Sequence, residues 1–339
     1  MKCYHSFIIS TKISPYECLV QLYAVIKHKM INPKIPIILL TDKKSFEIFK
    51  SLELVDIYDD VITDIFDDYP YDRISDVFWS SPKIWAISKL PTPFAIIDTD
   101  LIYSRPLKEF EHFDFGYLHR ETSNVYPRPY EISTPNGFNW ESDMLYYFRI
   151  STPINAAVLY FNNEIFKKEF TQRYFNFVLD NKGEFINIAE ELLKDNVIVN
   201  GILTSYIAPS AAVIFAEQAM LGALVEKYMS TDTIFRSGQV LPIIFNSAFF
   251  NRFSAEEDRK SIQEMINESY YHLWGAKYFI NNDECNCKLP KIAEMLIKSG
   301  QELLTNGNCW DKYGGIYERY KEEIIQSLQT ANSLEDTTK

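Results

Sequence analysis

Two short runs of almost entirely apolar residues constrain the fold of this chain more than any other feature. They are IPIILLTD at 35–42 and FAIID at 94–98, and each ends in polar or acidic residues. A strand that is apolar on both faces has to be covered on both faces, which is typical of a parallel sheet flanked by helices. The sequence therefore predicts an α/β fold.

The segments around these runs predict strands and helices in alternation. Strands are expected at 4–10, 35–42 and 94–98, with a weaker pattern at 55–62, and helices at 14–31 and 80–90. This order is typical of an α/β domain built from β-α-β units. In the helix at 80–90, Ser81 is the expected cap and Pro82 lies in the first turn.

The rest of the chain is less regular. Strands are expected at 113–120, 154–162, 240–246 and 270–274, and helices at 163–180, 184–195, 216–228, 289–304 and 315–329. A loop rich in Pro, Asn, Ser and Tyr covers 123–141, and loops of that length are often functional. We expect one α/β domain at 1–285, a helical extension packed on it at 286–330, and a disordered tail at 331–339.

Composition and charge exclude several classes of function. The chain has 339 residues, 47% of them apolar, which is enough for a sizeable core. Its net charge of −12 gives no general attraction for nucleic acid or for an anionic membrane. The most apolar stretch, 207–225, contains Pro209, Glu217 and Gln218, which favours buried elements over a membrane span. We expect a soluble, cytoplasmic protein with at most peripheral membrane association.

The five cysteines do not indicate a clear disulfide framework. Their odd number disfavours a set of disulfides. Cys285 and Cys287 form a C-x-C with Cys309 downstream, which leaves two interpretations, part of a zinc site or reduced thiols in a turn.

The carboxylates of Asp98 and Asp100 lie at the carboxyl end of a predicted buried strand. Ligands of open α/β sheets collect at such ends. Residues i and i+2 of an extended chain point to the same side, roughly 7 Å apart, so the pair could hold one hard divalent cation. The alternative is solvation, as for the acidic pairs at 59–60 and 67–68, but those pairs do not follow an apolar run.

A second group of polar residues follows the strand expected at 270–274. His272 is succeeded by Gly275 and Lys277. A neutral imidazole suits a borderline metal such as manganese, and a lysine beside a metal suits a phosphate. The alternative for His272 is a hydrogen-bonded histidine of the core.

Several motifs together resemble those of GT-A glycosyltransferases. The helix WSSPKIWAIS precedes the strand ending in IDTD, and INAAVLYFN, AEQAML and the H-x-x-G of residues 272–275 follow in that order. The order is similar to bacterial sequences around glycosyltransferase families 8 and 32 and to related GT-A-like proteins, over most of residues 4–280. Two positions depart from the family pattern: Ala157 replaces a glycine, and Lys277 lies two residues after Gly275 instead of three.

The resemblance implies a GT-A, Rossmann-like fold with a mixed central sheet and a set of site residues. Asp98, Asp100 and His272 would hold Mn²⁺ or Mg²⁺, which would bind the diphosphate of a nucleotide-sugar, with a UDP-sugar favoured. Glu217 and Gln218 would lie near the transferred sugar. Further contacts to the donor are expected from Ser10, Thr11, Thr41, Asp42, Lys83, Thr99, Asn155 and Lys277.

Some of these residues also have a plain structural interpretation. Lys83 could be a solvated helix lysine, and Thr41 or Asp42 could be a strand-to-helix cap. A buried Glu217 needs a partner, so it is either paired structurally or directed into the site. In the site it would be the base of an inverting enzyme, or would hydrogen-bond the sugar in a retaining one, which is the outcome in the resembled families. Tyr126, Tyr130 and Trp140 could stack on a sugar or could be ordinary loop packing.

The expected function is that of a metal-dependent, hexosyl-type glycosyltransferase, retaining as in the resembled families. It would use a glycan, lipid-linked or other hydroxyl acceptor in bacterial surface polysaccharide synthesis. One alternative is a degenerate GT-A domain that binds a nucleotide or glycan without turnover. Another is a metal-dependent phosphohydrolase, which would usually carry more acids and histidines than this chain, with its five His.

Overall fold

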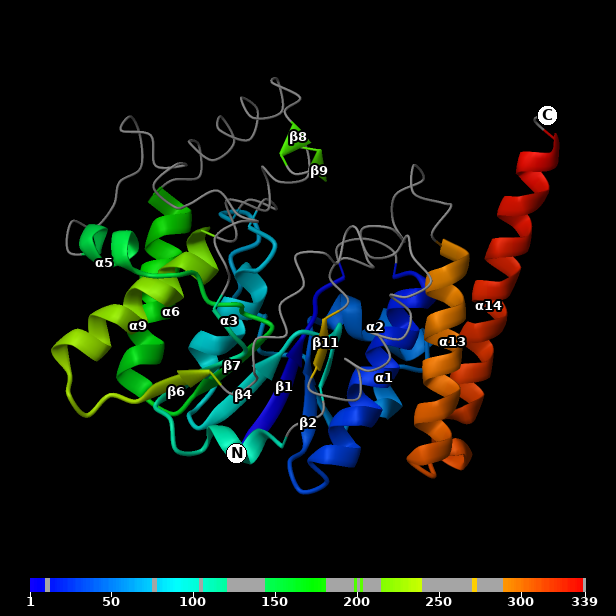
Figure 1. Ribbon diagram of the computed structural model, residues 1–339, viewed down its shortest axis with the longest axis horizontal. Helices are drawn as coiled ribbons and strands as arrows, with labels where there is room; N and C mark the ends of the chain where they lie inside the picture. The colour runs from blue at the N-terminus through cyan, green and yellow to red at the C-terminus, as the bar shows by residue number, and fades with distance from the viewer. Residues whose placement is uncertain are drawn as a thin grey trace. The chain divides into compact units, whose positions relative to one another are not determined.

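The computed structural model shows an α/β fold, as the sequence predicts (Figure 1). It describes residues 1–9, 13–74, 78–103, 106–120, 144–180, 198–199, 202–203, 215–239, 270–272 and 289–337. In these residues the main sheet is mixed and has seven strands. The expected mixed sheet and C-terminal helices are therefore confirmed.

The chain forms two compact units whose segments alternate along the sequence. The first unit contains residue 1, 65–97 and 107–243, and the second contains 2–64, 98–106 and 244–339. The boundaries expected at 285 and 330 stay predictions.

The first unit contains four strands of the mixed sheet in the order β10-β6-β7-β4. These strands are Ser237–Gln239, Phe115–Tyr117, Val158–Phe161 and Phe94–Ile97. The strand β10 is parallel to β6, while β6 and β4 are both antiparallel to β7. The rings of Phe94 and Phe115 lie 5.5 and 5.1 Å from that of Phe161, so aromatic packing forms the core here.

Helices of the first unit pack on one another. They are α3 (Ser81–Lys89), α5 (Leu145–Ile150), α6 (Glu164–Asp180) and α9 (Met220–Thr231). Shorter elements are η2 (Leu107–Phe110), the π-helical segment η3 (Phe215–Ala219), β8 (Ile198–Val199) and β9 (Ile202–Leu203). The helix α6 contacts α3 and α9, and α9 contacts α5.

The second unit is built on three parallel strands, β1 (Lys2–Ser6), β2 (Ile37–Leu40) and β3 (Asp60–Ile62). The helix α1 (Pro15–Ile31) joins β1 to β2, and α2 (Lys43–Ser51) with η1 (Val55–Ile57) joins β2 to β3. These are the β-α-β connections that the sequence predicts. The segment α2 was not expected, and the strand expected at 55–62 is confined to β3.

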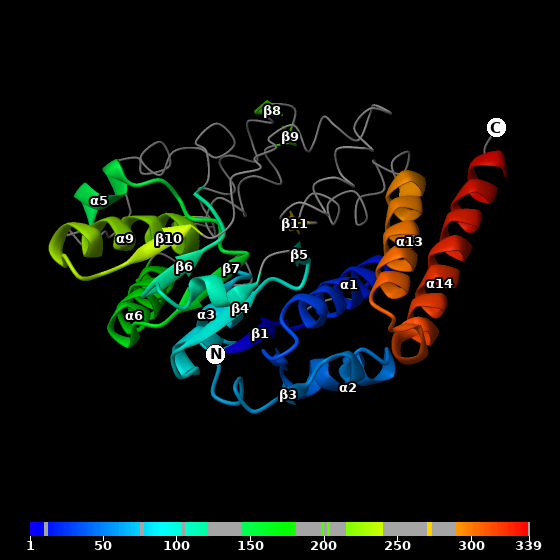
Figure 2. The same cartoon turned by 60° about the horizontal axis from the view of Figure 1, so that its bottom comes forward.

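Two C-terminal helices, α13 (Leu289–Asn306) and α14 (Trp310–Thr337), pack on α1 (Figures 1 and 2). The Tyr23 hydroxyl of α1 donates a hydrogen bond to the Leu296 carbonyl at 2.7 Å. A Cβ atom at Gly300 would lie 2.0 Å from that hydroxyl, so only glycine allows this approach. The helix α14 continues to Thr337, into the segment where the sequence predicts a disordered tail. In the described ranges, none of the helices has the length and apolar content that a membrane crossing needs.

Candidate functional site

The ammonium group of Lys83 and the carboxylate of Glu217 form a buried ion pair in the first unit. Lys83 is the third residue of α3, and Glu217 lies in η3. Nζ and Oε1 are 2.7 Å apart, and their side chains are 10% and 2% exposed. Nζ also donates to the Ala156 carbonyl at 3.2 Å. A buried charge has to be compensated, and here the compensating groups come from segments that are distant in the sequence.

The segment before β7 is tied to η3 by its backbone. Ile154 donates its N–H to the Gln218 carbonyl at 3.0 Å. Asn155 donates its N–H to the His119 carbonyl, and its side-chain oxygen accepts from the Ala157 N–H at 2.9 Å. The structure thus brings together four residues predicted for the site, Lys83, Asn155, Glu217 and Gln218. We call them the lysine–glutamate group.

The π-helical turn η3 gives this group an unusual backbone. Single π turns occur often at functional sites, and the sequence predicted an ordinary helix here. The side-chain oxygen of Gln218 is buried and accepts no hydrogen bond from the described residues. Because a buried acceptor without a donor is costly, it suits a ligand that carries a hydroxyl group.

The start of α3, which carries Lys83, is anchored by Tyr174 of α6. The Tyr174 hydroxyl lies 3.0 Å from the Ser80 hydroxyl and 2.8 Å from that of Ser81. Burial raises the pKa of Tyr174, so the phenol stays neutral. The expected cap at Ser81 is wrong: Ser80 is the cap residue, and it makes no side-chain capping bond because both serine hydroxyls engage Tyr174.

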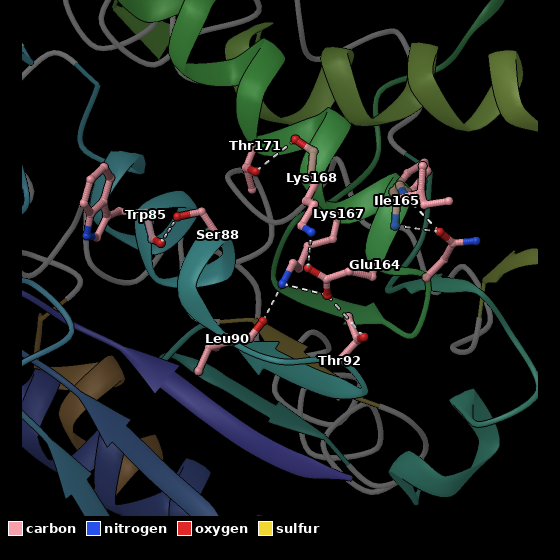
Figure 3. Close-up of polar contacts among 11 residues, drawn as sticks. Trp85, Ser88, Leu90, Thr92, Glu164, Ile165, Lys167, Lys168 and Thr171 are labelled. Carbon is pink, nitrogen blue, oxygen red and sulfur yellow. Dashed lines mark hydrogen bonds and ion pairs between the residues drawn. The ribbon is translucent and has the colours of Figure 1, made fainter.

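The other end of α3 is held by a buried lysine of α6 (Figure 3). Lys167 donates to the carbonyl of Leu90, the C-cap residue of α3. Its ammonium group also lies 3.0 Å from Glu164, which accepts from the Thr92 hydroxyl at 3.3 Å. A cation at a helix C-terminus complements the helix dipole. Both ends of α3 are therefore fixed to α6.

The second predicted motif, Asp98-Thr99-Asp100, forms a turn between β4 and β5 (Leu101–Tyr103). We call these three residues the aspartate turn. The Leu101 N–H donates to the Asp98 carbonyl at 3.1 Å, which closes it. Asp98 is half-buried, while Thr99 and Asp100 are 7% and 3% exposed. A buried and a half-buried carboxylate, two residues apart, fit a hard divalent cation.

Strand pairing brings the backbone of the predicted third ligand next to this turn. The strand β5 is antiparallel to β11 (Tyr270–His272), and His272 is in register with Leu101, the residue after Asp100. In the described residues, which do not include the His272 side chain, no cluster of three or more metal-binding side chains occurs. The donor set that these residues would supply, two carboxylates and the imidazole of His272, nevertheless fits Mn²⁺ or Mg²⁺ chemically.

Beneath β5 lies a buried polar network that the sequence analysis missed. The Tyr103 hydroxyl bonds to Nδ1 of His28 and accepts from the Asn32 amide at 3.1 Å. His28 Nε2 lies 2.8 Å from the Ile35 carbonyl. Because a carbonyl only accepts, Nε2 carries the proton and Tyr103 donates to Nδ1. The signal was present, since a histidine inside the apolar helix predicted at 14–31 needs a partner.

A similar network surrounds His5 of β1. Its Nδ1 lies 3.0 Å from the Tyr58 hydroxyl, which accepts from the Gln21 amide at 2.6 Å. The pKa of His5 is lowered to about 3, mainly by burial and also by His28, while the charge of Asp100 acts in the opposite direction. Burial likewise lowers the pKa of His28. His5 and His28 are therefore neutral at neutral pH.

The remaining predicted residues are distributed as follows. The Thr41 hydroxyl donates to the Phe7 carbonyl at 2.7 Å, and the Asp42 carboxylate caps α2 by accepting from the Ser45 N–H at 2.7 Å. Asp42 thus has the capping role left open by the sequence, while the Thr41 hydroxyl instead ties the end of β2 to Phe7. A nucleotide contact stays a prediction for both. Ser10, Thr11, Tyr126, Tyr130, Trp140, Gly275, Lys277, Cys285 and Cys287 lie outside the described residues.

No protein-family model matches the sequence, and no curated protein matches it. Solved structures similar to the chain are glycosyltransferases. GlyE of Streptococcus pneumoniae TIGR4 is 13% identical, with a TM-score of 0.30; the match covers 70% of this chain but only 45% of GlyE. Mouse xyloside xylosyltransferase 1 is 14% identical, with 70% and 84% covered and a TM-score of 0.35. The galactosyltransferase LgtC is 10% identical, with 63% and 70% covered and a TM-score of 0.31.

Proposed function

We propose that the protein is a metal-dependent glycosyltransferase of the GT-A type. It would move a sugar, of hexosyl type, from a nucleotide-diphosphate donor, with UDP favoured, to a hydroxyl of a glycan or lipid-linked acceptor. The setting would be bacterial surface polysaccharide synthesis in the cytoplasm, with at most peripheral membrane contact. The observation that carries the proposal is the buried aspartate turn with the His272 backbone in register beside it.

The aspartate turn would hold the diphosphate end of the donor through a cation. Asp98, Asp100 and His272 are the proposed ligands, because carboxylate oxygens and a neutral imidazole suit Mn²⁺ or Mg²⁺. When bound, the cation would neutralise the negative charge that develops on the departing diphosphate. Thr99, between the two carboxylates, would contact the donor.

The lysine–glutamate group would hold the sugar. Glu217 is paired with Lys83 at 2.7 Å, so its carboxylate is held in place by an ammonium donor. This supports a role as hydrogen-bond acceptor for a sugar hydroxyl, as in a retaining enzyme, over a role as general base. The Gln218 side-chain oxygen would accept a second sugar hydroxyl. Lys83 would donate to the donor sugar or to its phosphate.

Further donor contacts are proposed from four segments. Asn155, near Lys83, would contact the sugar. The residues proposed for the nucleotide and its phosphates are Ser10, Thr11, Thr41, Asp42 and Lys277.

One observation favours the alternative of binding without turnover. The Lys83 ammonium already contacts two protein acceptors, Glu217 and the Ala156 carbonyl. If that pair does not open, Lys83 has little capacity left for a substrate. Such a protein would bind a nucleotide or glycan and would transfer nothing.

The first experiment is a calorimetric titration of UDP and of GDP into the purified protein, with manganese and with excess chelator. Manganese-dependent binding of one nucleotide, lost in Asp100→Ala, is the expected result. A transfer assay with the matching nucleotide-sugar and added acceptors then separates turnover from binding. No binding of either nucleotide to a folded protein would overturn the proposal. Binding without transfer to any acceptor would favour the alternative.

A further inference from the structure

The strand β5 is too short to fix its own position. It has three residues, and so does its antiparallel partner β11, with which it forms a separate two-stranded sheet. Two-stranded ribbons are marginally stable by themselves in water. Its place therefore depends on the contacts that its side chains make with the rest of the second unit.

The described polar contacts of β5 side chains converge on Tyr103, its last residue. The Tyr103 ring is 2% exposed and meets the His28 ring edge-to-face, with 6.1 Å between centroids. Its hydroxyl donates to His28 Nδ1 and accepts from the Asn32 amide. Because His28 is in turn held by the Ile35 carbonyl, the imidazole presents its acceptor nitrogen to the phenol.

Movement of β5 would displace two elements of the candidate metal site together. Asp100 directly precedes Leu101, the first residue of β5, and His272 is in register with Leu101 across the strand pair. A shift or tilt of β5 would therefore alter the spacing between the Asp100 carboxylate and the His272 backbone. Groups that orient ligands in this way affect metal affinity strongly, because coordination tolerates only small displacements.

We propose that Tyr103 is a positioning residue: its hydroxyl, held by His28 and Asn32, sets the place of β5 and thereby the geometry of the metal ligands. The proposal rests on the proposed function, since it assumes a cation at the aspartate turn. It adds a residue and a direct connection from α1 to that turn. Burial raises the pKa of Tyr103 and lowers that of His28, so both partners stay neutral and the bond is maintained at neutral pH.

The test is manganese binding to the folded protein without nucleotide, measured by calorimetry and by the electron paramagnetic resonance of free Mn²⁺. Tyr103→Phe removes one oxygen atom and is expected to weaken manganese binding about 10-fold to 100-fold. The matched control is Tyr23→Phe, which removes the hydroxyl of a buried tyrosine in the same unit, on α1, where it bonds to α13. The control is expected to bind manganese as the wild type does, even if it melts at a lower temperature.

A milder variant keeps the test decisive if Tyr103→Phe does not fold. Asn32→Ala removes only the amide that donates to Tyr103 and leaves the bond to His28 in place. It is expected to weaken manganese binding by a smaller factor, about 3-fold to 10-fold. A graded loss over these two variants, absent from Tyr23→Phe, supports the positioning role.

The possible failures are distinguishable. A wild-type protein that binds no manganese overturns the proposed function and this inference with it. Wild-type binding that is unchanged in folded Tyr103→Phe and Asn32→Ala overturns the inference alone. Equal weakening in Tyr23→Phe also overturns it, because the effect would then be a general loss of stability.

Discussion

The lysine–glutamate group and the aspartate turn both place carboxylates in buried surroundings, but the source of the compensating positive charge differs. Glu217 has an ammonium at 2.7 Å within its own unit. Near Asp100, the described histidines are neutral and are bonded to neutral tyrosines, as for His5 and His28. The first group thus supplies its own counter-charge. For the second group, the counter-charge that we propose is an added cation.

The difference also separates two kinds of evidence for function. A buried ion pair is weak evidence, because such pairs occur in purely structural roles and their net contribution to stability is small. A buried Asp100 beside a half-buried Asp98, in a closed turn at the end of a buried strand, is stronger evidence, because ligands of open α/β sheets collect at such ends. We therefore rest the proposed function on the aspartate turn and use the lysine–glutamate group only to assign roles.

The largest effects should come from removing one carboxylate from each group in turn. Asp100→Asn is expected to abolish manganese binding and to lower the rate of sugar transfer about 100-fold or more. Glu217→Gln is expected to lower the rate by a similar factor and to leave manganese affinity unchanged, because its group does not bind the cation. Calorimetry with manganese and initial rates with a UDP-sugar measure both.

The control for these two variants is Asp72→Asn, which changes an exposed carboxylate in a turn of the first unit. Asp72→Asn should alter neither the manganese affinity nor the rate of sugar transfer. If Glu217→Gln loses manganese binding as Asp100→Asn does, the functional division between the two groups is wrong.

The second largest effect concerns stability. Lys83→Met leaves the buried Glu217 carboxylate without its cation and is expected to lower the free energy of unfolding by about 3–5 kcal/mol. The double variant Lys83→Met/Glu217→Leu removes both charges and should recover most of that loss without recovering transfer activity. Urea denaturation of the wild type, the single variant and the double variant measures the free energy of unfolding of each. A double variant as unstable as the single one would show that packing, and not the charge, is what Lys83 supplies.

Local patterns predicted much of the fold. The apolar runs became β2 and β4, and the helix predicted at 14–31 is α1, which begins at Pro15 with Ser14 and Glu17 forming a capping box. Asp98 and Asp100 were identified because acidic residues at the end of a buried strand are a local signal. Their closed turn and the register of His272 depend on pairing that the sequence does not reveal.

Long-range polar contacts could not be predicted. Lys83 and Glu217 were each proposed for the site, yet nothing in either segment indicates that they pair. The same holds for Tyr103 and His28, which are 75 residues apart. The helix α2 was missed because it is short and largely exposed, with only Ser45 and Phe49 buried. A rule that every polar residue inside an apolar segment needs a partner would have marked His5, Gln21 and His28, but not their partners.

The neutral histidines predict how stability depends on pH. Burial lowers the pKa of His28 from 6.5; the Ile35 hydrogen bond and Asp59 raise it, and Lys29 lowers it. A histidine with a lowered folded-state pKa binds a proton below pH 6.5 mainly in the unfolded chain, so stability is full above that pH and falls below it. The expected loss is up to about 1.4 kcal/mol per pH unit for each such histidine.

Chemical denaturation at pH 7, 6 and 5 measures this slope, because few carboxyl groups titrate in that range. In His28→Gln, the slope of the unfolding free energy against pH should be smaller by the contribution of one histidine. The contribution of His5 should remain. An unchanged slope would mean that His28 takes up a proton in the folded protein, and the network beneath β5 would then not be neutral.

The smallest effect should come from the start of α1, and it tests whether metal binding follows general stability or the position of β5. Ser14 caps α1 by accepting from the Glu17 N–H at 3.3 Å, while Glu17 accepts in return from the Ser14 N–H at 2.9 Å. Ser14→Ala is expected to lower the free energy of unfolding by about 1 kcal/mol. The His28 and Asn32 bonds lie at the other end of the helix, so manganese affinity should stay at the wild-type value. If it falls with the melting temperature, as in Tyr103→Phe, the aspartate turn depends on the stability of the whole unit and not on one hydroxyl.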